Sequence, residues 1–188
     1  MELIKKIEKI LTIKTILPNG WELKNHPELQ NDKEAVMVAV KNCPWALEYA
    51  SDELRANKEV VMEAVKQDGL ALYYASDELK KDKEFMLEAV KQNGWALQYA
   101  IEEFRGDKEV VLEVVKKNGL DLQFASAELR ANKEIVLEAV KQYGRALRYA
   151  SEELRNDIEV LFEAVKQNVR ALEFASEELK KELSTNKN

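Results

Sequence analysis

Apolar and polar residues alternate along this chain in a pattern that recurs every 25 residues. One copy reads WALEYASDELRANKEVVMEAVKQDG, and the copy after it reads LALYYASDELKKDKEFMLEAVKQNG. The copies begin, in chain order, at Trp45, Leu70, Trp95, Leu120, Arg145 and, truncated, Arg170, after a degenerate copy from about residue 21. A fixed period of this length is typical of a solenoid, in which each repeat buries its apolar side against its neighbours.

The second half of each repeat predicts a helix of about ten residues, such as residues 58–67. Its apolar positions in this copy are Val60, Val61, Met62, Ala64 and Val65. Asn57 or its equivalent precedes the helix, where its side-chain oxygen can accept a hydrogen bond from a free backbone amide. Lys66 lies near the end, where a cation is favourable. The following glycine, Gly69 in this copy, is expected to end the helix in a left-handed conformation.

The first half of each repeat predicts a shorter helix, about residues 46–50 in the first full copy, followed by a second turn. A serine can cap that turn in most copies, and these serines are Ser51, Ser76, Ser126, Ser151 and Ser176. Ile101 takes the serine's place in the third copy. Helices this short are marginal alone, so their stability must come from packing between repeats.

Residues 2–16 predict an amphipathic helix that ends at Pro18, Asn19 and Gly20. Its apolar residues are expected to cover the exposed end of the array. The sequence therefore predicts an all-α fold, a short α-solenoid of 25-residue helix-turn-helix repeats with an N-terminal capping helix. Its parts are the capping helix and turn (1–20), the repeat array (21–182) and a polar tail (183–188).

The repeat resembles an uncharacterised family of tandem bacterial, protist and viral repeats, catalogued as a domain of unknown function. Its units read much like A-L-x-[YF]-A-S-x-E-L-[RK]-x-[DN]-K-E-V-V-L-x-A-V-K-Q-N-G. The resemblance covers about residues 45–182, with a weaker match from residue 21. It implies an all-α repeat fold and no activity, cofactor or partner. The chain departs from the pattern at Ile101, Phe104, Gly106, Asp121, Ile158 and Val169.

Composition argues against an enzyme. The chain has one histidine, His26, and one cysteine, Cys43, which leaves little from which to build a zinc site or a catalytic triad. Paired carboxylates such as Asp52 and Glu53 recur in almost every repeat, which is typical of a structural role. Glycines occur singly at helix ends, so no phosphate-binding loop is present. We therefore expect no catalytic, metal or cofactor-binding residues.

The net charge and the lengths of the apolar runs disfavour some classes of partner and some locations in the cell. The net charge of −6 disfavours a nucleic-acid partner, because such proteins normally carry a basic excess. Lysines interrupt the first residues every few positions, so these do not predict a signal peptide. No stretch approaches the roughly 20 apolar residues of a membrane span. We expect a protein without membrane insertion, in the cytoplasm of the producing cell or of a host.

Three positions of the repeat, 1, 4 and 8, change character between copies and are predicted to form one stripe on the first helix. Aromatic side chains mark this stripe in the first half of the array, and arginines mark it in the second half. Trp, Tyr and Arg are enriched at the centres of protein interfaces. The predicted partner-binding residues are Trp45, Tyr73, Trp95, Gln98, Gln123, Arg145, Arg148 and Arg170.

Two interpretations of this stripe stay open. It can bind a partner protein, or Trp45, Leu70, Trp95 and Leu120 can cover the edge of the core between repeats. The predicted function is a non-enzymatic protein-binding scaffold or inhibitor. The alternative is a helical repeat protein that binds single-stranded nucleic acid by stacking bases on a recurring ring. Tyr and Phe do recur at position 5, but that position belongs to the apolar set.

Overall fold

The computed structural model describes residues 2–15 and 17–185 and contains two compact bodies, residues 1–99 and residues 100–188. Over the described ranges every regular element is a helix and no strand occurs, which confirms the predicted all-α repeat fold. Within the same ranges, no helix combines the length and the apolar character that crossing a bilayer requires.

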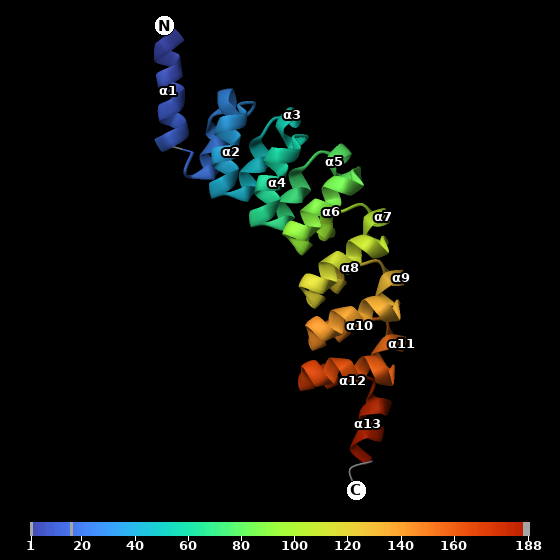
Figure 1. Cartoon of the computed structure of the whole chain (residues 1–188). Helices are drawn as coiled ribbons and strands as arrows, with labels where there is room; N and C mark the ends of the chain where they lie inside the picture. The colour runs from blue at the N-terminus through green and yellow to red at the C-terminus, as the bar shows by residue number, and fades with distance from the viewer. Residues whose placement is uncertain (1, 16, 186–188) are drawn as a thin grey trace. The chain divides into compact units, whose positions relative to one another are not determined.

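The N-terminal body begins with the long helix α1 (Figure 1). Its helices, with 3-10 helices written η, are α1 (Glu2–Thr15), η1 (Gly20–Asn25), η2 (Pro27–Leu29), α2 (Lys33–Asn42), η3 (Pro44–Tyr49), α3 (Asp52–Arg55), α4 (Lys58–Gln67), η4 (Gly69–Tyr74), α5 (Asp77–Lys81), α6 (Lys83–Gln92) and η5 (Gly94–Tyr99).

The C-terminal body continues the same alternation of one 3-10 helix, one very short α-helix and one ten-residue α-helix. Its helices are α7 (Glu102–Arg105), α8 (Lys108–Lys117), η6 (Gly119–Phe124), α9 (Ala127–Arg130), α10 (Lys133–Gln142), η7 (Gly144–Tyr149), α11 (Glu152–Arg155), α12 (Ile158–Gln167), η8 (Val169–Phe174) and α13 (Glu177–Thr185). The predicted polar tail from residue 183 is thus helical as far as Thr185, and residues 186–188 lie outside the described residues.

The first helix of each repeat is a 3-10 helix where the sequence predicted a short helix of unspecified type. In η3 the Ala46 amide donates to the Cys43 carbonyl (2.9 Å) and the Ala50 amide donates to the Leu47 carbonyl (3.2 Å). These bonds join residues three apart, as in a 3-10 helix. In the full repeats the predicted second turn is a separate helix of four or five residues, and in the truncated last repeat it is the nine-residue helix α13.

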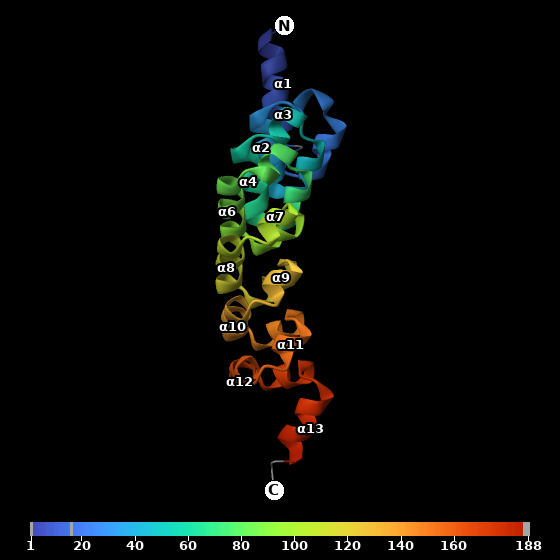
Figure 2. The same cartoon turned by 90° about the vertical axis from the view of Figure 1, so that its right-hand side faces the viewer.

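The helices of each body form two rows. In the N-terminal body α4 packs between α2 and α6, and η4 packs between η3 and η5. In the C-terminal body α10 packs between α8 and α12, and η7 packs between η6 and η8. Figure 2 shows α10 and α12 in one column and α9 and α11 in another. Fully buried leucines of the 3-10 helices fill the core, and these are Leu23, Leu47, Leu72, Leu97, Leu122 and Leu147.

The capping residues act as the sequence predicted, and one of them also joins neighbouring repeats. The Asn57 side chain accepts a hydrogen bond from the Val60 amide at the start of α4. The Ser76 hydroxyl oxygen accepts a hydrogen bond from the Leu79 amide (3.3 Å). The Ser76 amide donates to the Arg55 carbonyl of the preceding repeat (2.9 Å). The serine hydroxyl therefore satisfies one free amide at the helix start. The backbone amides of Ser51, Ser76, Ser126 and Ser151 also add a backbone hydrogen bond across the joint between repeats.

The predicted left-handed glycines are absent, because no described glycine has a positive φ. Gly119 and Gly144 instead permit close approach of the next repeat. A Cβ added to Gly119 would lie 2.0 Å from the Ala139 carbonyl oxygen, and one added to Gly144 would lie 2.2 Å from the Ala164 carbonyl oxygen. The prediction that glycine caps the helix was wrong. Glycine is required here because a neighbouring repeat lies against it, and the sequence of one repeat does not show that contact.

Helix α1 forms where predicted, but it does not cover the repeats as expected. Ile13 is the one residue of the helix that is buried, and Leu17 is buried just beyond it. The other apolar residues of the helix are exposed, and these are Leu3, Ile4, Ile7, Ile10 and Leu11. An ion pair between Lys9 and Asp32 also ties α1 to the start of α2. The helix thus contacts the array near its end, and most of its apolar side faces solvent.

Candidate binding surfaces

The row of 3-10 helices in the N-terminal body carries four of the predicted partner-binding residues, Trp45, Tyr73, Trp95 and Gln98. Positions 1 and 4 of a repeat are three residues apart, and side chains at that spacing align in a 3-10 helix. Position 8 is Asp52 in the first full repeat and belongs to α3, beyond the extended residue Ala50. The prediction of one stripe through positions 1, 4 and 8 was therefore wrong, since the first helix ends between positions 5 and 8.

Position 1 of one repeat lies against position 5 of the next. The Trp45 and Tyr74 rings meet edge-on with 6.0 Å between centroids, and Trp21 and Tyr49 meet in the same way at 6.2 Å. The Tyr74 hydroxyl donates to Glu48 Oε2 (3.3 Å). Burial, and then the Glu48 carboxylate, raise the pKa of Tyr74. Trp45 is half-buried, so in this repeat the tryptophan seals the joint, as the second interpretation held.

Tyr73 is the most exposed aromatic residue among those predicted, with 55% of its surface accessible. Its ring meets the rings of Tyr74 (5.0 Å) and Tyr99 (5.2 Å) edge-on. Lys80 Nζ lies 5.9 Å from the Tyr73 centroid and donates a hydrogen bond to the Tyr73 carbonyl (2.7 Å). Burial lowers the pKa of Lys80. The tyrosine is therefore held in place by neighbouring rings while one side faces solvent.

A hollow lies beside Tyr73, with a volume of about 610 Å³. Its lining residues come from α3, η4 and α5 and are Asp52, Arg55, Ala56, Tyr73, Tyr74, Ala75, Ser76, Asp77, Glu78 and Lys80. Trp95 is 46% exposed on the neighbouring helix η5, and Gln98 is exposed on the same helix. The structure thus brings Tyr73 together with a polar hollow, a feature that sequence reasoning did not find.

In the C-terminal body an arginine takes the place of the sealing tryptophan. Arg145 is half-buried, and its guanidinium carbon lies 5.8 Å from the centroid of the Phe174 ring. Its Nε is buried and has no hydrogen-bond partner among the described residues. Arg145 therefore fills the joint between repeats by packing, much as Trp45 does in the other body.

The remaining predicted residues of the C-terminal body differ in exposure. Arg148 is exposed and lies over the Tyr149 ring at 4.5 Å, and Arg170 is exposed on η8. Gln123 is half-buried on η6. Two arginines are thus accessible on this body, and the predicted continuity of this surface with the aromatic one stays a prediction.

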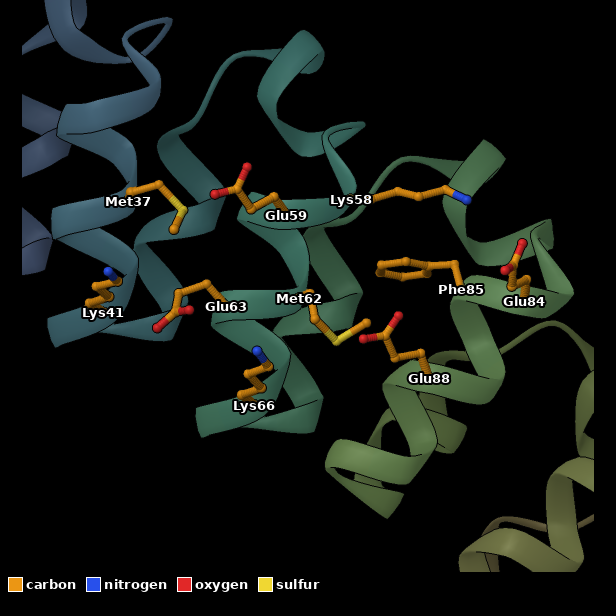
Figure 3. A pocket seen from close by; sticks show the side chains of 10 residues that line it. All are labelled: Met37, Lys41, Lys58, Glu59, Met62, Glu63, Lys66, Glu84, Phe85 and Glu88. Atoms are coloured by element: carbon orange, nitrogen blue, oxygen red, sulfur yellow. The ribbon is translucent and has the colours of Figure 1, made fainter.

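A groove lies on the row of ten-residue helices in the N-terminal body, with a volume of about 550 Å³ (Figure 3). It is lined by Met37, Lys41, Lys58, Glu59, Met62, Glu63, Lys66, Glu84, Phe85 and Glu88. Figure 3 shows Met62 of α4 near Phe85 and Glu88 of α6. Lys33 pairs with Glu59 (2.5 Å) and Lys58 pairs with Asp82 (2.6 Å). The groove is therefore lined by methionine side chains and by both acidic and basic side chains.

Sequence reasoning missed this groove because it took position 18 of the repeat as core. Met62 is buried, but Met37 and Leu112 are half-buried and Phe162 is exposed. The sequence did contain a signal that position 18 is not uniform core, because the residue there is Met, Leu or Phe in different copies. Apolar residues on both sides of a short helix cannot all be buried when only two rows are present.

Asp121 is a charged group inside the C-terminal body, with 3% of its surface exposed. It stands at position 2, where the other full repeats have alanine. Asn118 Nδ2 donates a hydrogen bond to Asp121 Oδ1 (3.0 Å). Burial raises the pKa of Asp121 to about 6. Over the described residues, no group of three or more His, Cys, Asp and Glu side chains is arranged to hold a metal ion.

Comparison with known proteins gives one match. A family model described as a domain of unknown function, DUF4116, matches residues 19–55, 57–105, 107–155 and 132–180. The later matches each span about two of the 25-residue repeats, and together the matches cover most of the chain. No curated protein matches the chain, and no solved structure matches it.

Proposed function

Since the chain belongs to the DUF4116 family, which is defined by a domain of unknown function, we propose a function from its own surfaces. It is a non-enzymatic scaffold or inhibitor that binds another protein. The binding surface comprises Tyr73, Trp95 and Gln98 on η4 and η5, together with the hollow beside Tyr73. On the C-terminal body, the exposed Arg148 and Arg170 and the half-buried Gln123 form a separate set of proposed contact residues. We place the protein in the cytoplasm of the producing cell or of a host.

The observation that supports this proposal most is the setting of Tyr73. A large aromatic side chain that is 55% exposed leaves apolar surface in water, yet its ring is fixed by Tyr74 and Tyr99. A fixed side chain loses little conformational entropy when a partner binds. Tyrosine also offers a hydroxyl beside its apolar ring, which suits a surface that alternates between free and bound states.

The chemistry around Tyr73 indicates what a partner presents. An apolar side chain of the partner packs on Tyr73 and Trp95, and a polar backbone or side chain enters the hollow between Arg55 and Lys80. Gln98 offers both a donor and an acceptor at the edge. On the C-terminal body Arg148 and Arg170 favour carboxylates.

The alternative function, binding of single-stranded nucleic acid, has less support. Base stacking needs accessible ring faces, whereas Tyr49, Tyr74 and Tyr99 at position 5 are half-buried. Tyr49 and Tyr74 meet tryptophan edge-on. The net charge of −6 also opposes binding to phosphates.

The proposal is tested by capturing partners from the producing cell with the full chain and comparing variants by quantitative mass spectrometry. Tyr73→Ala and Trp95→Ala should each weaken capture of the same protein by about 5- to 150-fold, since hot-spot truncations cost roughly 1–3 kcal/mol. Tyr143→Ala is the control, because this exposed aromatic residue lies at the end of α10 and outside the 3-10 helices. Equal capture by all three variants would contradict the surface, and saturable binding of a single-stranded oligonucleotide would favour the alternative.

A further inference from the structure

The last full repeat differs from the others at a lysine that normally joins repeats. Position 14 is lysine in the preceding copies. In most of them it pairs with a carboxylate of the following repeat, as Lys33 does with Glu59 (2.5 Å) and Lys133 with Asp157 (2.8 Å). At this position α12 has Ile158, which is 73% exposed. The change removes an ion-pairing group and places an aliphatic side chain in solvent.

The same repeat also lacks the glycine that lets a neighbour approach. Val169 stands where Gly119 and Gly144 stand in the preceding copies, and it is 72% exposed. Added Cβ atoms on those two glycines would lie 2.0 Å and 2.2 Å from a carbonyl oxygen of the next ten-residue helix. A further repeat stacked in the same way would therefore collide with the Val169 side chain.

These changes create an apolar surface at the end of the C-terminal body, where Figure 1 shows α12 and α13. A hollow of about 350 Å³ lies on it, lined by Ile158, Leu161, Phe162, Val165, Leu172, Leu179 and Glu182. Phe162 is 64% exposed, although position 18 is the smaller Leu or Met in the preceding copies. We call the surface formed by Ile158, Phe162, Val169 and this hollow the terminal face. A large apolar surface that is exposed in this way indicates a contact with another molecule.

The chain carries a second apolar surface without a cover, on α1. Leu3, Ile4, Ile7, Ile10 and Leu11 are between 50% and 71% exposed. Their spacing places them on one side of the helix. Helix α1 has 14 residues and is about 21 Å long, whereas the ten residues of α12 span about 15 Å. An amphipathic helix of this length can lie along α12 over its full extent.

We propose that α1 of one copy of this chain docks on the terminal face of a second copy. Side-chain size supports this occupant. Ala139 and Ala164, in joints between repeats, are fully buried, so helices approach closely there. Val169 enforces a wider joint, and α1 presents only Ile and Leu side chains on its apolar side, which fill a wider space. The distance between packed helices increases with the side chains at their contact.

Charge supports the same occupant. Helix α1 carries four lysines and two glutamates, a net charge of +2. Residues 158–182 carry six glutamates and four basic residues, a net charge of −2. Opposite charges around an apolar contact favour this pairing over pairing of two terminal faces, which would bring like charges together. The contact is head-to-tail, so a pair of copies keeps one free α1 and one free terminal face, and longer chains of copies form.

Sedimentation equilibrium of the full chain over a wide concentration range tests the proposal. The wild-type mass should rise with concentration beyond that of a dimer. Ile7→Glu on α1 should give a monomer, and so should the double change Ile158→Lys with Phe162→Glu on the terminal face. All these side chains are exposed, so the folds should persist, which circular dichroism and thermal melting check.

Mixing the two variants gives the sharpest result. The Ile7→Glu chain keeps an intact terminal face and the double variant keeps an intact α1, so an equimolar mixture should form a dimer and nothing larger. A monomeric wild type at all concentrations overturns the proposal, and so does a mixture that stays monomeric. Undiminished association of Ile7→Glu also overturns it, because the contact then does not involve α1. Tyr73→Ala should leave association unchanged, so this test is independent of the proposed partner surface.

Discussion

The Trp45 indole of one repeat meets the Tyr74 ring of the next edge-on, with 6.0 Å between the ring centroids and 85° between the ring planes. Arg145 takes the equivalent place in the C-terminal body, 5.8 Å from the centroid of Phe174. Edge-on ring pairs and cation–π contacts each contribute about 1 kcal/mol beyond the area that they bury. The joint between repeats is therefore covered by an aromatic pair in the N-terminal body and by a cation–π contact in the C-terminal body.

Replacing Trp45 with alanine should lower the free energy of unfolding by roughly 2 kcal/mol, less than the about 3–5 kcal/mol of a fully buried tryptophan. The loss arises because the side chain covers the joint and the Tyr74 ring. Gln98→Ala is the control on the same row of helices, where an exposed side chain should change stability by less than about 0.5 kcal/mol. Urea denaturation measures both, and equal midpoints for the two variants would show that Trp45 does not seal the joint.

Gly119→Ala should destabilise the protein by about 2–3 kcal/mol or more, because the new Cβ would lie 2.0 Å from the Ala139 carbonyl oxygen and force the repeats apart. Gly106→Ala is a matched control, since its Cβ would meet no atom closer than 3.6 Å. That change should leave the free energy of unfolding unchanged or raise it by about 0.5 kcal/mol, because alanine lowers the conformational entropy of the unfolded chain. Thermal and urea melts compare the two, and a similar loss at Gly106 would contradict the close-approach explanation.

Asp121→Ala should stabilise the protein at pH 7 by roughly 2–3 kcal/mol, because the folded state holds the pKa near 6 against about 3.9 when unfolded. Below about pH 4 the carboxyl is protonated in both states and carries no penalty. Between pH 4 and 6 only the unfolded chain releases the proton, so stability falls as pH rises, and above pH 6 the penalty is complete.

The difference in unfolding free energy between Asp121→Ala and wild type should therefore shrink towards zero as pH falls from 7 to 4. Urea denaturation at several pH values measures it. A difference that stays constant over this range would mean that Asp121 is ionised in the folded protein throughout and that the alanine acts by packing alone.

Val65→Asp and Leu112→Asp should differ, although both are apolar positions of the ten-residue helix. Val65 is fully buried, so a carboxylate there lacks solvation and should cost more than about 3 kcal/mol. Leu112 is half-buried, and a carboxylate there can reach water, so the loss should be about 1 kcal/mol. Melting temperatures of the two variants measure this difference. A larger loss for Leu112→Asp than for Val65→Asp would refute the assignment of position 18 to the groove side.

The sequence alone determined the features that act within one repeat. Asn57 and Ser76 cap their helices as predicted, because a cap depends on the residue and the few amides that follow it. The period of 25 residues determined the all-α repeat fold, because copies with the same apolar positions bury the same side against each other. The candidate residue Tyr73 was also found this way, from its variation between copies.

Only the tertiary structure decided the features that depend on a neighbouring repeat. Gly119 is needed because a carbonyl of another helix lies against it, and no property of its own segment shows that contact. Trp45 and Tyr73 are both aromatic, yet one closes a joint and the other faces solvent beside a hollow. Helix α1 is amphipathic in sequence, but amphipathicity does not state which surface covers its apolar side. Burial is a property of packed pairs, so the structure had to supply the second member of each pair.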